Sequence, residues 1–226
     1  MGWEIHSVSR QGVFRDSRAQ SPAAILVLAA ARRLTILAMT TVTRHAALQT
    51  RAALLIIDVQ VGLVELMPPE IQRNVLPRIG TLLAKARASG TLVIYIQHDG
   101  KKGHPLEAGT KGWKIHPSLQ PADKELVIRK RASDSFFGTT LQQELEQRGV
   151  SHLIIAGAMT EYCVDTTCRR ATSLGYNVTL VGDAHLTRDT EALTAAKIIA
   201  HHNFVLDDFS AGDHAIRVKP TDQIVF

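Results

Sequence analysis

Short apolar runs alternate with amphipathic segments along residues 52–226. A run of four to eight apolar residues is typical of a buried strand, whereas apolar residues spaced three and four apart indicate a helix. Strands are predicted on this basis at residues 53–59, 92–97, 125–129, 152–157, 177–181 and 204–206. Helical spacing is found in the segments 71–86, 141–145, 164–174 and 193–199.

This alternation predicts an α/β protein with a parallel sheet. Consecutive parallel strands need crossover connections, and right-handed crossovers cover both faces of the sheet with helices. Gly90, Gly149 and Gly175 stand where three predicted helices end, a place where a left-handed residue is favourable. We therefore expect a three-layer α/β/α, doubly wound sheet of six parallel strands in a domain that comprises residues 51–226.

The longest interruption of the pattern is residues 98–124, which are rich in glycine, lysine, proline and histidine. A segment of this length inside a compact domain is typically functional. We expect it to form the roof of a site at the sheet edge.

The formal net charge of +5 is concentrated in the first fifty residues. That segment holds six arginines and no lysine against Glu4 and Asp16, which leaves the rest of the chain nearly neutral. A nearly neutral domain gives little support to a nucleic-acid or membrane-surface partner. We expect neither.

Residues 1–50 are predicted to be an N-terminal extension, for which three interpretations stay open. The extension could be disordered or non-native, since Met39 reads like a natural start and residues 1–38 would then be a translated upstream region. Arginine without lysine also suits a targeting segment. An ordered structural element is the third interpretation. We expect a cytoplasmic protein, or an organellar one if residues 1–38 are a targeting segment.

The two cysteines, Cys163 and Cys168, lie five positions apart and would project from different faces of a helix. They do not form a disulfide framework, which favours a reducing compartment. Cys168 is expected to be a small buried core residue. Cys163 follows a small-residue turn at the start of a helix, whose partial positive charge favours a thiolate.

Two charged residues close other predicted strands. Asp58 follows the run Ala-Leu-Leu-Ile-Ile, and Lys130 follows Glu-Leu-Val-Ile-Arg. The carboxyl ends of parallel strands meet at one edge of the sheet, where open α/β proteins place their active sites. We expect Asp58, Lys130 and Cys163 to converge at this edge.

Three separated motifs resemble those of the isochorismatase-like cysteine hydrolases. They are Asp58-Val-Gln60, then Lys130 followed by Asp134-Ser-Phe136-Phe-Gly138-Thr139-x-Leu141, then Gly157-x-x-Thr160-x-x-Cys163-Val164 with Asp183-Ala184 after the next strand. The resemblance extends from residue 52 to residue 226. It implies the strand order 3-2-1-4-5-6 and a catalytic triad of Asp58, Lys130 and Cys163.

The reaction that the resemblance implies is hydrolysis of a carbon–nitrogen bond of a small molecule through a cysteine thioester. Cys163 would be the nucleophile, Asp58 the general base and then acid, and Lys130 the cation that stabilises both. The resemblance also implies an oxyanion hole made by the backbone N–H groups of Met159 and Cys163. It places a cis peptide bond between Ala158 and Met159.

The resemblance also bears on the substrate pocket and on a possible metal site. Gln60, Leu63, Phe136 and Tyr162 match positions that line its pocket, and Trp113 lies in the predicted roof, although core packing explains Phe136 equally well. Related nicotinamidases bind a metal through Asp-x-His after the second strand. Gln97-His98-Asp99 does not reproduce that motif, so we expect no metal and no cofactor. Asp134 and Thr160 are expected to cap the helices that follow them.

Other interpretations stay open at this point. Cys163 could be a buried structural cysteine, Asp58 a loop cap and Lys130 a solvated lysine at a strand end. The chain could then be a catalytically silent binding module, or it could hydrolyse a non-amide substrate as an isochorismatase does. A dinucleotide-dependent oxidoreductase is disfavoured, because no Gly-x-Gly-x-x-Gly follows the first strand. Family analogy suggests a homodimer or homotetramer.

Overall fold

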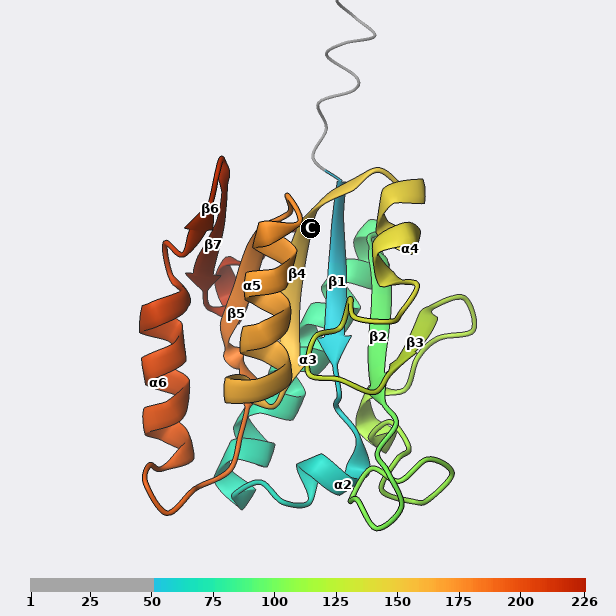
Figure 1. The fold of residues 1–226 in the computed structure, drawn as a ribbon, viewed down its shortest axis with the longest axis vertical. Coiled ribbons are helices and arrows are strands. Elements are labelled where there is room, and N and C mark those ends of the chain that lie inside the picture. Colours follow the sequence, from blue (N-terminus) through green and yellow to red (C-terminus); the bar gives the residue numbers. More distant parts are fainter. Residues whose placement is uncertain (1–50) are drawn as a thin grey trace, which may run out of the picture. The chain divides into compact units, whose positions relative to one another are not determined.

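Seven strands form one sheet in the computed structural model, which describes residues 51–226; the extension predicted at residues 1–50 lies outside the described residues. The strand order is β3-β2-β1-β4-β5-β7-β6 (Figure 1). All pairs are parallel except β6 with β7, which is antiparallel. The strands are β1 (Arg51–Ile57), β2 (Leu92–His98), β3 (Leu126–Lys130), β4 (Val150–Ala158), β5 (Asn177–Leu186), β6 (Ser210–Ala211) and β7 (His214–Lys219). The predicted order of the first five strands is confirmed.

The sixth parallel strand was predicted at the wrong place. Residues 204–206 form the last turn of α6 (Ala195–Leu206), in which Phe204 is 82% exposed and Leu206 is fully buried. The strand beside β5 is β7 instead. Three apolar residues are too few to separate a strand from a helix end. In β7, Ile216 is the one fully buried residue, so the apolar signal of the true strand is weak.

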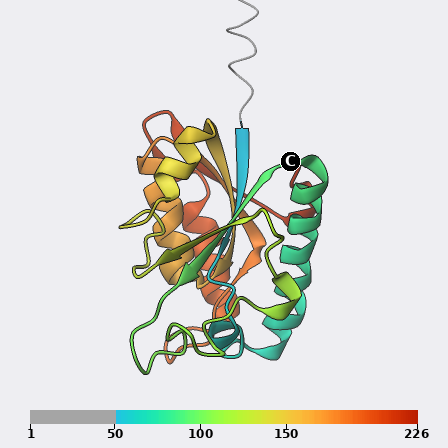
Figure 2. The same ribbon diagram turned by 90° about the vertical axis from the view of Figure 1, so that its right-hand side faces the viewer.

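Helices cover both faces of the sheet (Figure 2). One face carries α3 (Pro69–Ser89), and the other carries α4 (Leu141–Gln147), α5 (Asp165–Ser173) and α6. Short turns complete the fold, namely α2 (Val61–Val64), η1 (Pro117–Leu119), η2 (Thr160–Val164) and η3 (Thr221–Gln223). Within residues 51–226, no helix combines the length and the apolar character that a bilayer crossing requires.

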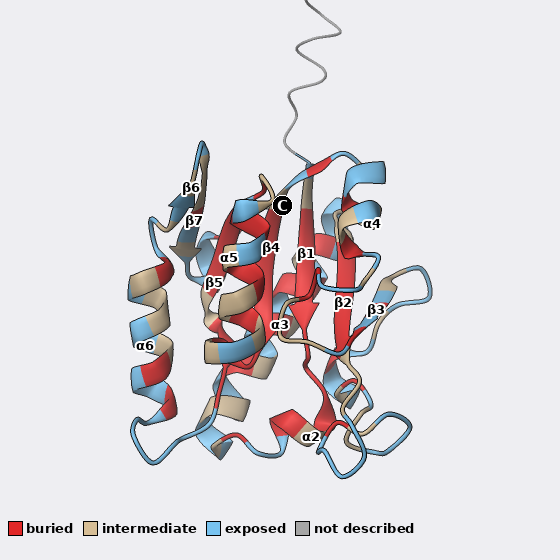
Figure 3. Cartoon of the chain, in the orientation of Figure 1, coloured by how far each residue is buried: buried red, intermediate tan, exposed pale blue. Residues whose placement is uncertain are grey.

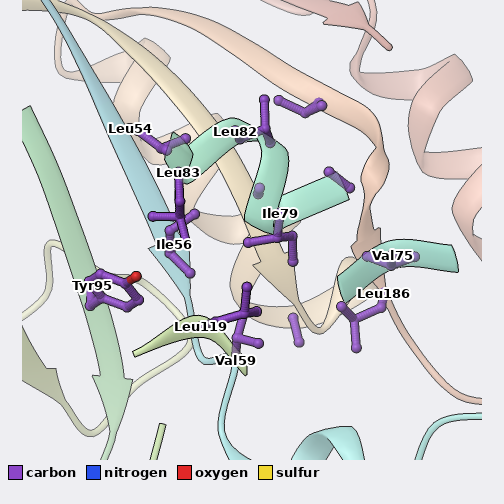
Figure 4. Close-up of a cluster of buried hydrophobic side chains, with 14 of the residues drawn as sticks. Leu54, Ile56, Val59, Val75, Ile79, Leu82, Leu83, Tyr95, Leu119 and Leu186 are labelled. Atoms are coloured by element: carbon purple, nitrogen blue, oxygen red, sulfur yellow. The ribbon is translucent and has the colours of Figure 1, made fainter. Parts of the chain in front are cut away.

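The strands in the middle of the sheet are buried along most of their length (Figure 3). Because side chains alternate along a strand, Leu54 and Ile56 of β1 pack toward α3 and Leu55 and Ile57 pack toward the opposite helices. Figure 4 shows the cluster of buried side chains on the α3 face of the sheet, in which Ile79 and Leu82 of α3 lie over β1. Burial on both faces explains why β1 reads as a continuous apolar run.

Gly157 allows β1 and β4 to meet closely at the edge where the site lies. Its φ of 126° favours glycine, and a Cβ there would lie 2.1 Å from the carbonyl oxygen of Ile57. Ile57 and Gly157 are register partners, so Asp58 and the cysteine-bearing turn leave the sheet side by side.

Candidate active site

The three residues predicted to form a triad leave the sheet at its carboxyl edge, the end toward which the β1 arrowhead points in Figure 1. Asp58 directly follows β1, Lys130 is the last residue of β3, and Cys163 lies in η2, the π-helical turn after β4. Asp58 has a left-handed backbone with φ of 48°, and its N–H donates to the Ile96 carbonyl at 2.9 Å. Aspartate is among the few residues that accept this conformation readily.

A buried ion pair forms the centre of the site. Lys130 Nζ lies 2.7 Å from Asp58 Oδ2, and both side chains are fully buried. The ammonium also donates to the Ala132 and Ser133 carbonyls, at 2.9 and 3.3 Å. The Cys163 sulfur lies within 4.8 Å of an Asp58 carboxylate oxygen. The structure thus brings all three predicted residues together.

The electrostatics of the site keep Cys163 protonated at rest, which corrects the prediction of a thiolate. Burial and the negative charge of Asp58 raise the pKa of the Cys163 thiol to about 12, although Lys130 acts in the opposite direction. Burial alone would lower the pKa of Lys130, but Asp58 and Cys163 outweigh it and raise that pKa. The site therefore holds an ammonium, a carboxylate beside it and a neutral thiol.

Alkylation of Cys163 by iodoacetamide is expected to accelerate with rising pH and to show no plateau near neutral pH, because the thiolate is the reactive form. Asp58→Asn removes a negative charge that opposes the thiolate, so this variant should be alkylated faster at pH 7. Cys168 is fully buried and serves as the unreactive internal control. A wild-type rate that is already constant between pH 6 and 8 would contradict a protonated resting thiol.

His98, the last residue of β2, joins the site although the sequence suggested only that it does not reproduce a metal motif. One of its ring nitrogens lies within 4.8 Å of both an Asp58 carboxylate oxygen and the Cys163 sulfur. Its position at the end of the strand beside β1 was the sequence signal that could have placed it there.

Asp58, His98 and Cys163 form the one group of potential metal ligands that the structure brings together within residues 51–226. The Lys130 ammonium already lies 2.7 Å from Asp58 and places a buried positive charge against any added cation. This donor set does not fit a resident metal well, and the absence of a metal stays a prediction.

A cavity of about 270 Å³ opens onto the triad. Two of the predicted substrate-binding residues, Leu63 and Tyr162, line it, and so does Met159. The lining also includes residues that were not predicted as pocket residues, namely His98, His104, Leu106, Ser133 and Arg188. His104 and Leu106 come from the segment 98–124, so part of that segment walls the cavity as expected.

Gln60, Trp113 and Phe136 do not line this cavity, which corrects their assignment. Gln60 is fully buried and hydrogen-bonds to the backbone of its neighbours, and Trp113 Nε1 donates to Asp99 Oδ1 at 2.8 Å. Phe136 is a core residue that stacks on Tyr176, with ring centroids 6.0 Å apart. Motif position alone could not separate a pocket residue from one that supports the pocket from behind.

The turn after β4 has the cis peptide bond between Ala158 and Met159 that the resemblance implies. Thr160 does not cap a helix, because its hydroxyl hydrogen-bonds to Nδ1 of His185 at 2.9 Å. Asp134 also does not cap the following helix. Its Oδ1 accepts from Phe136 N–H at 2.8 Å, and the first N–H of α4 donates to Thr139 Oγ1.

The profile of the isochorismatase domain matches residues 52–205, which is most of the part that the structure describes. The chain belongs to the isochorismatase family. A streptothricin hydrolase from Streptomyces noursei is 42% identical over 142 residues, which are 62% of this chain and 51% of that protein. The chain thus matches about half the length of this relative.

Two further proteins are similar to this chain. A crystal structure of an isochorismatase from Pseudomonas putida has a TM-score of 0.69 and 32% identity, covering 77% of this chain and 90% of that one. A ureidoacrylate amidohydrolase from Variovorax paradoxus is 25% identical over an alignment of 171 residues, and the match covers 61% of this chain and 68% of that protein.

In this isochorismatase-family chain, a buried histidine supports the cysteine-bearing turn from behind. His185 of β5 hydrogen-bonds to Thr160 through Nδ1 and to Asn203 Oδ1 of α6 through Nε2 at 2.8 Å. Asn203 in turn donates to the Gly182 carbonyl. Burial lowers the pKa of His185 to about 4, so the imidazole is neutral and both of its nitrogens are satisfied.

The free energy of unfolding is expected to fall as the pH drops from 6.5 to about 4, because His185 binds a proton more tightly in the unfolded state than in the folded state. The contribution of neutral His185 to stability is fully present above pH 6.5, the pKa of the unfolded state, and is lost as the pH falls to about 4, the pKa of the folded state. Its complete loss lowers the free energy of unfolding by about 3 kcal/mol. Urea unfolding at several pH values measures it. His185→Gln, which cannot titrate, should show a smaller loss, and an equal loss would contradict this assignment.

Proposed function

We propose that this isochorismatase-family protein is a cysteine hydrolase that cleaves a carbon–nitrogen bond of a small molecule through a thioester at Cys163. The observation that carries the proposal is the buried Asp58–Lys130 pair, with the Cys163 sulfur close to the same carboxylate and facing a small cavity. A thiol beside a base and a substrate-sized cavity is the arrangement that nucleophilic catalysis requires.

Acylation begins when the substrate carbonyl binds beside Cys163. Asp58 takes the thiol proton as the sulfur attacks the carbonyl carbon, and a tetrahedral intermediate forms. The N–H groups of Met159 and Cys163 would stabilise its oxyanion. Asp58 then gives the proton to the departing nitrogen, the C–N bond breaks, and the acyl group remains on the sulfur. Lys130 balances the charge of the Asp58 carboxylate until the thiol proton moves, and it stabilises the transient thiolate.

Hydrolysis of the thioester completes the cycle. A water molecule attacks the same carbonyl carbon, the C–S bond breaks, and the carboxylic acid leaves while the sulfur regains a proton. No redox step and no external group is needed, because Cys163 and Asp58 supply the nucleophile and the proton transfer. The absence of a cofactor stays a prediction.

Several observations favour an amide over the enol ether that gives the family its name. Hydrolysis of the enol ether does not require a cysteine in this family, whereas Cys163 is present here together with Asp58 and Lys130. Two of the relatives are named as a streptothricin hydrolase and a ureidoacrylate amidohydrolase. The activity of the whole protein remains our proposal.

The substrate is proposed to be small, with an acyl part that is at least partly apolar. The cavity of about 270 Å³ is slightly smaller than the usual ligand site. Leu63, Leu106 and Met159 give it apolar walls, while Arg188 places a cation in the lining. A homodimer or homotetramer in the cytoplasm stays part of the proposal.

Release of ammonia or amine from a panel of small amides, carbamoyl compounds and lactams tests the function. The panel includes ureidoacrylate and streptothricin, and isochorismate serves as the enol-ether comparison. We expect at least one amide to be hydrolysed by the wild type and not by Asp58→Asn, which suits the left-handed backbone at that position. Hydrolysis of isochorismate alone, equally fast in both proteins, would contradict the proposal.

A further inference from the structure

His98 is held against the triad by a buried side chain. Gln60 Nε2 donates to the His98 carbonyl at 3.0 Å, and the His98 N–H donates to Gln60 Oε1 at 2.8 Å. The same Gln60 amide donates to the Trp113 carbonyl at 2.8 Å. These bonds fix the backbone at the end of β2 and leave the imidazole free to face the cavity, which it lines.

The imidazole of His98 has hydrogen-bonding capacity that the protein does not use. Its Nδ1 is fully buried and has no hydrogen-bond partner among residues 51–226. Buried polar atoms are almost always paired, and an unpaired one at an active site calls for an explanation. The ring lines the cavity, but this nitrogen is closed to solvent, so a substrate group or a water molecule reaches it only after a small shift of the ring or its neighbours.

The imidazole of His98 is neutral at pH 7, because burial lowers its pKa and the Lys130 charge adds to that effect, against the opposing charge of Asp58. A neutral imidazole has one N–H donor and one acceptor nitrogen. It can therefore accept a hydrogen bond from an N–H or O–H group beside Cys163.

We propose that His98 is a fourth catalytic residue, which binds the scissile N–H during acylation and activates the water that hydrolyses the thioester. This inference rests on the proposed cysteine hydrolase function. The departing nitrogen and the incoming water are each bonded to the same carbonyl carbon, opposite the sulfur, so one acceptor nitrogen at that place serves both steps.

In the hydrolytic step, His98 carries one proton from the attacking water to the departing sulfur. The water oxygen forms the new C–O bond and gives a proton to the neutral imidazole of His98. The C–S bond then breaks, and the imidazolium returns the proton to the departing sulfur of Cys163.

The probe p-nitrophenyl acetate separates the two steps without knowledge of the natural substrate. Its leaving group needs no protonation, so acylation of Cys163 gives a rapid burst of nitrophenolate and hydrolysis of the acetyl thioester sets the slower steady state. In His98→Ala we expect the burst to remain at one product per site, while the steady-state rate falls about 100-fold. Intact-mass spectrometry should then find the acetylated protein accumulating.

Two further variants make the test decisive. His98→Gln keeps a hydrogen-bonding group but cannot take a proton, and its steady state should lie between those of the wild type and His98→Ala. His201→Ala removes an exposed histidine of α6 and should match the wild type. Thermal melting checks that each variant is folded.

The outcomes separate this inference from the proposed function. Steady-state rates equal to wild type in both His98 variants, with the wild-type burst intact, would overturn the role of His98 alone. A wild type without a burst, or a burst of the same size in Cys163→Ala, would overturn the proposed function itself and the role of His98 with it.

Discussion

Replacing Cys163 with alanine is expected to abolish amide hydrolysis, with a loss of about 10⁴-fold or more in kcat. The substitution removes the sulfur that forms the thioester, and the neighbouring Asp58 cannot replace it, because its carboxylate is paired with Lys130. The fold should be retained, since Cys163 is partly exposed at the cavity wall. Amine release under saturating substrate measures the effect.

Cys168→Ala provides the matched control for this prediction. The same atom is removed from the other cysteine, which is fully buried in the core between α5 and the sheet. We expect turnover close to wild type and a loss of about 1 kcal/mol in the free energy of unfolding. Equal loss of activity in both variants would show that the effect at Cys163 comes from the fold and not from the chemistry.

Replacing Lys130 with methionine is expected to reduce both stability and turnover. The variant leaves the Asp58 carboxylate buried without its counter-ion, which typically lowers the free energy of unfolding by about 3–5 kcal/mol. Turnover should fall by about 10²- to 10³-fold, because the transient thiolate loses its stabilising cation. Urea unfolding and amine release measure the two effects separately.

A double variant distinguishes the structural role of Lys130 from its catalytic role. Asp58→Asn together with Lys130→Met removes both charges, so most of the lost stability should return. Turnover should not return, since the proton carrier is also gone. Recovery of activity along with stability would contradict the roles given to these two residues.

The central part of the fold was readable from the sequence because it is buried on both faces. β1 lies in the middle of the sheet, so its apolar run is continuous and bounded. The part of the sheet beyond β5 was not readable in the same way. β7 has one fully buried residue, whereas residues 204–206 look apolar although Phe204 is solvent-exposed. The apolar pattern therefore failed to place the sixth parallel strand, because few residues of that strand are buried.

The site was predictable as far as topology alone determines it. Asp58, Lys130 and Cys163 each lie at or after the carboxyl end of a parallel strand, so they had to emerge at one edge. The resting state of Cys163 was not predictable, because it depends on burial and on a neighbouring carboxylate, which both raise the pKa of the thiol. These are tertiary effects that a motif does not contain.

The residues that line the cavity could not be predicted, because nearby positions in the sequence alternate between lining the cavity and supporting it from behind. Gln60 lies two positions after Asp58, yet it is buried behind the site and holds His98 from there. Arg188 lies just beyond the end of β5, outside the quoted motifs, and still reaches the cavity. Position in a motif shows nearness to the chemistry but not which side chain faces the substrate.

Mass spectrometry of the acid-quenched protein, sampled during turnover of an amide from the panel, tests the thioester at Cys163 most directly. We predict a mass increase equal to the acyl part of the substrate, located on Cys163 by peptide mapping and absent from Cys163→Ala. Sustained turnover by Cys163→Ala, or an acyl group found on a different residue, would contradict the account.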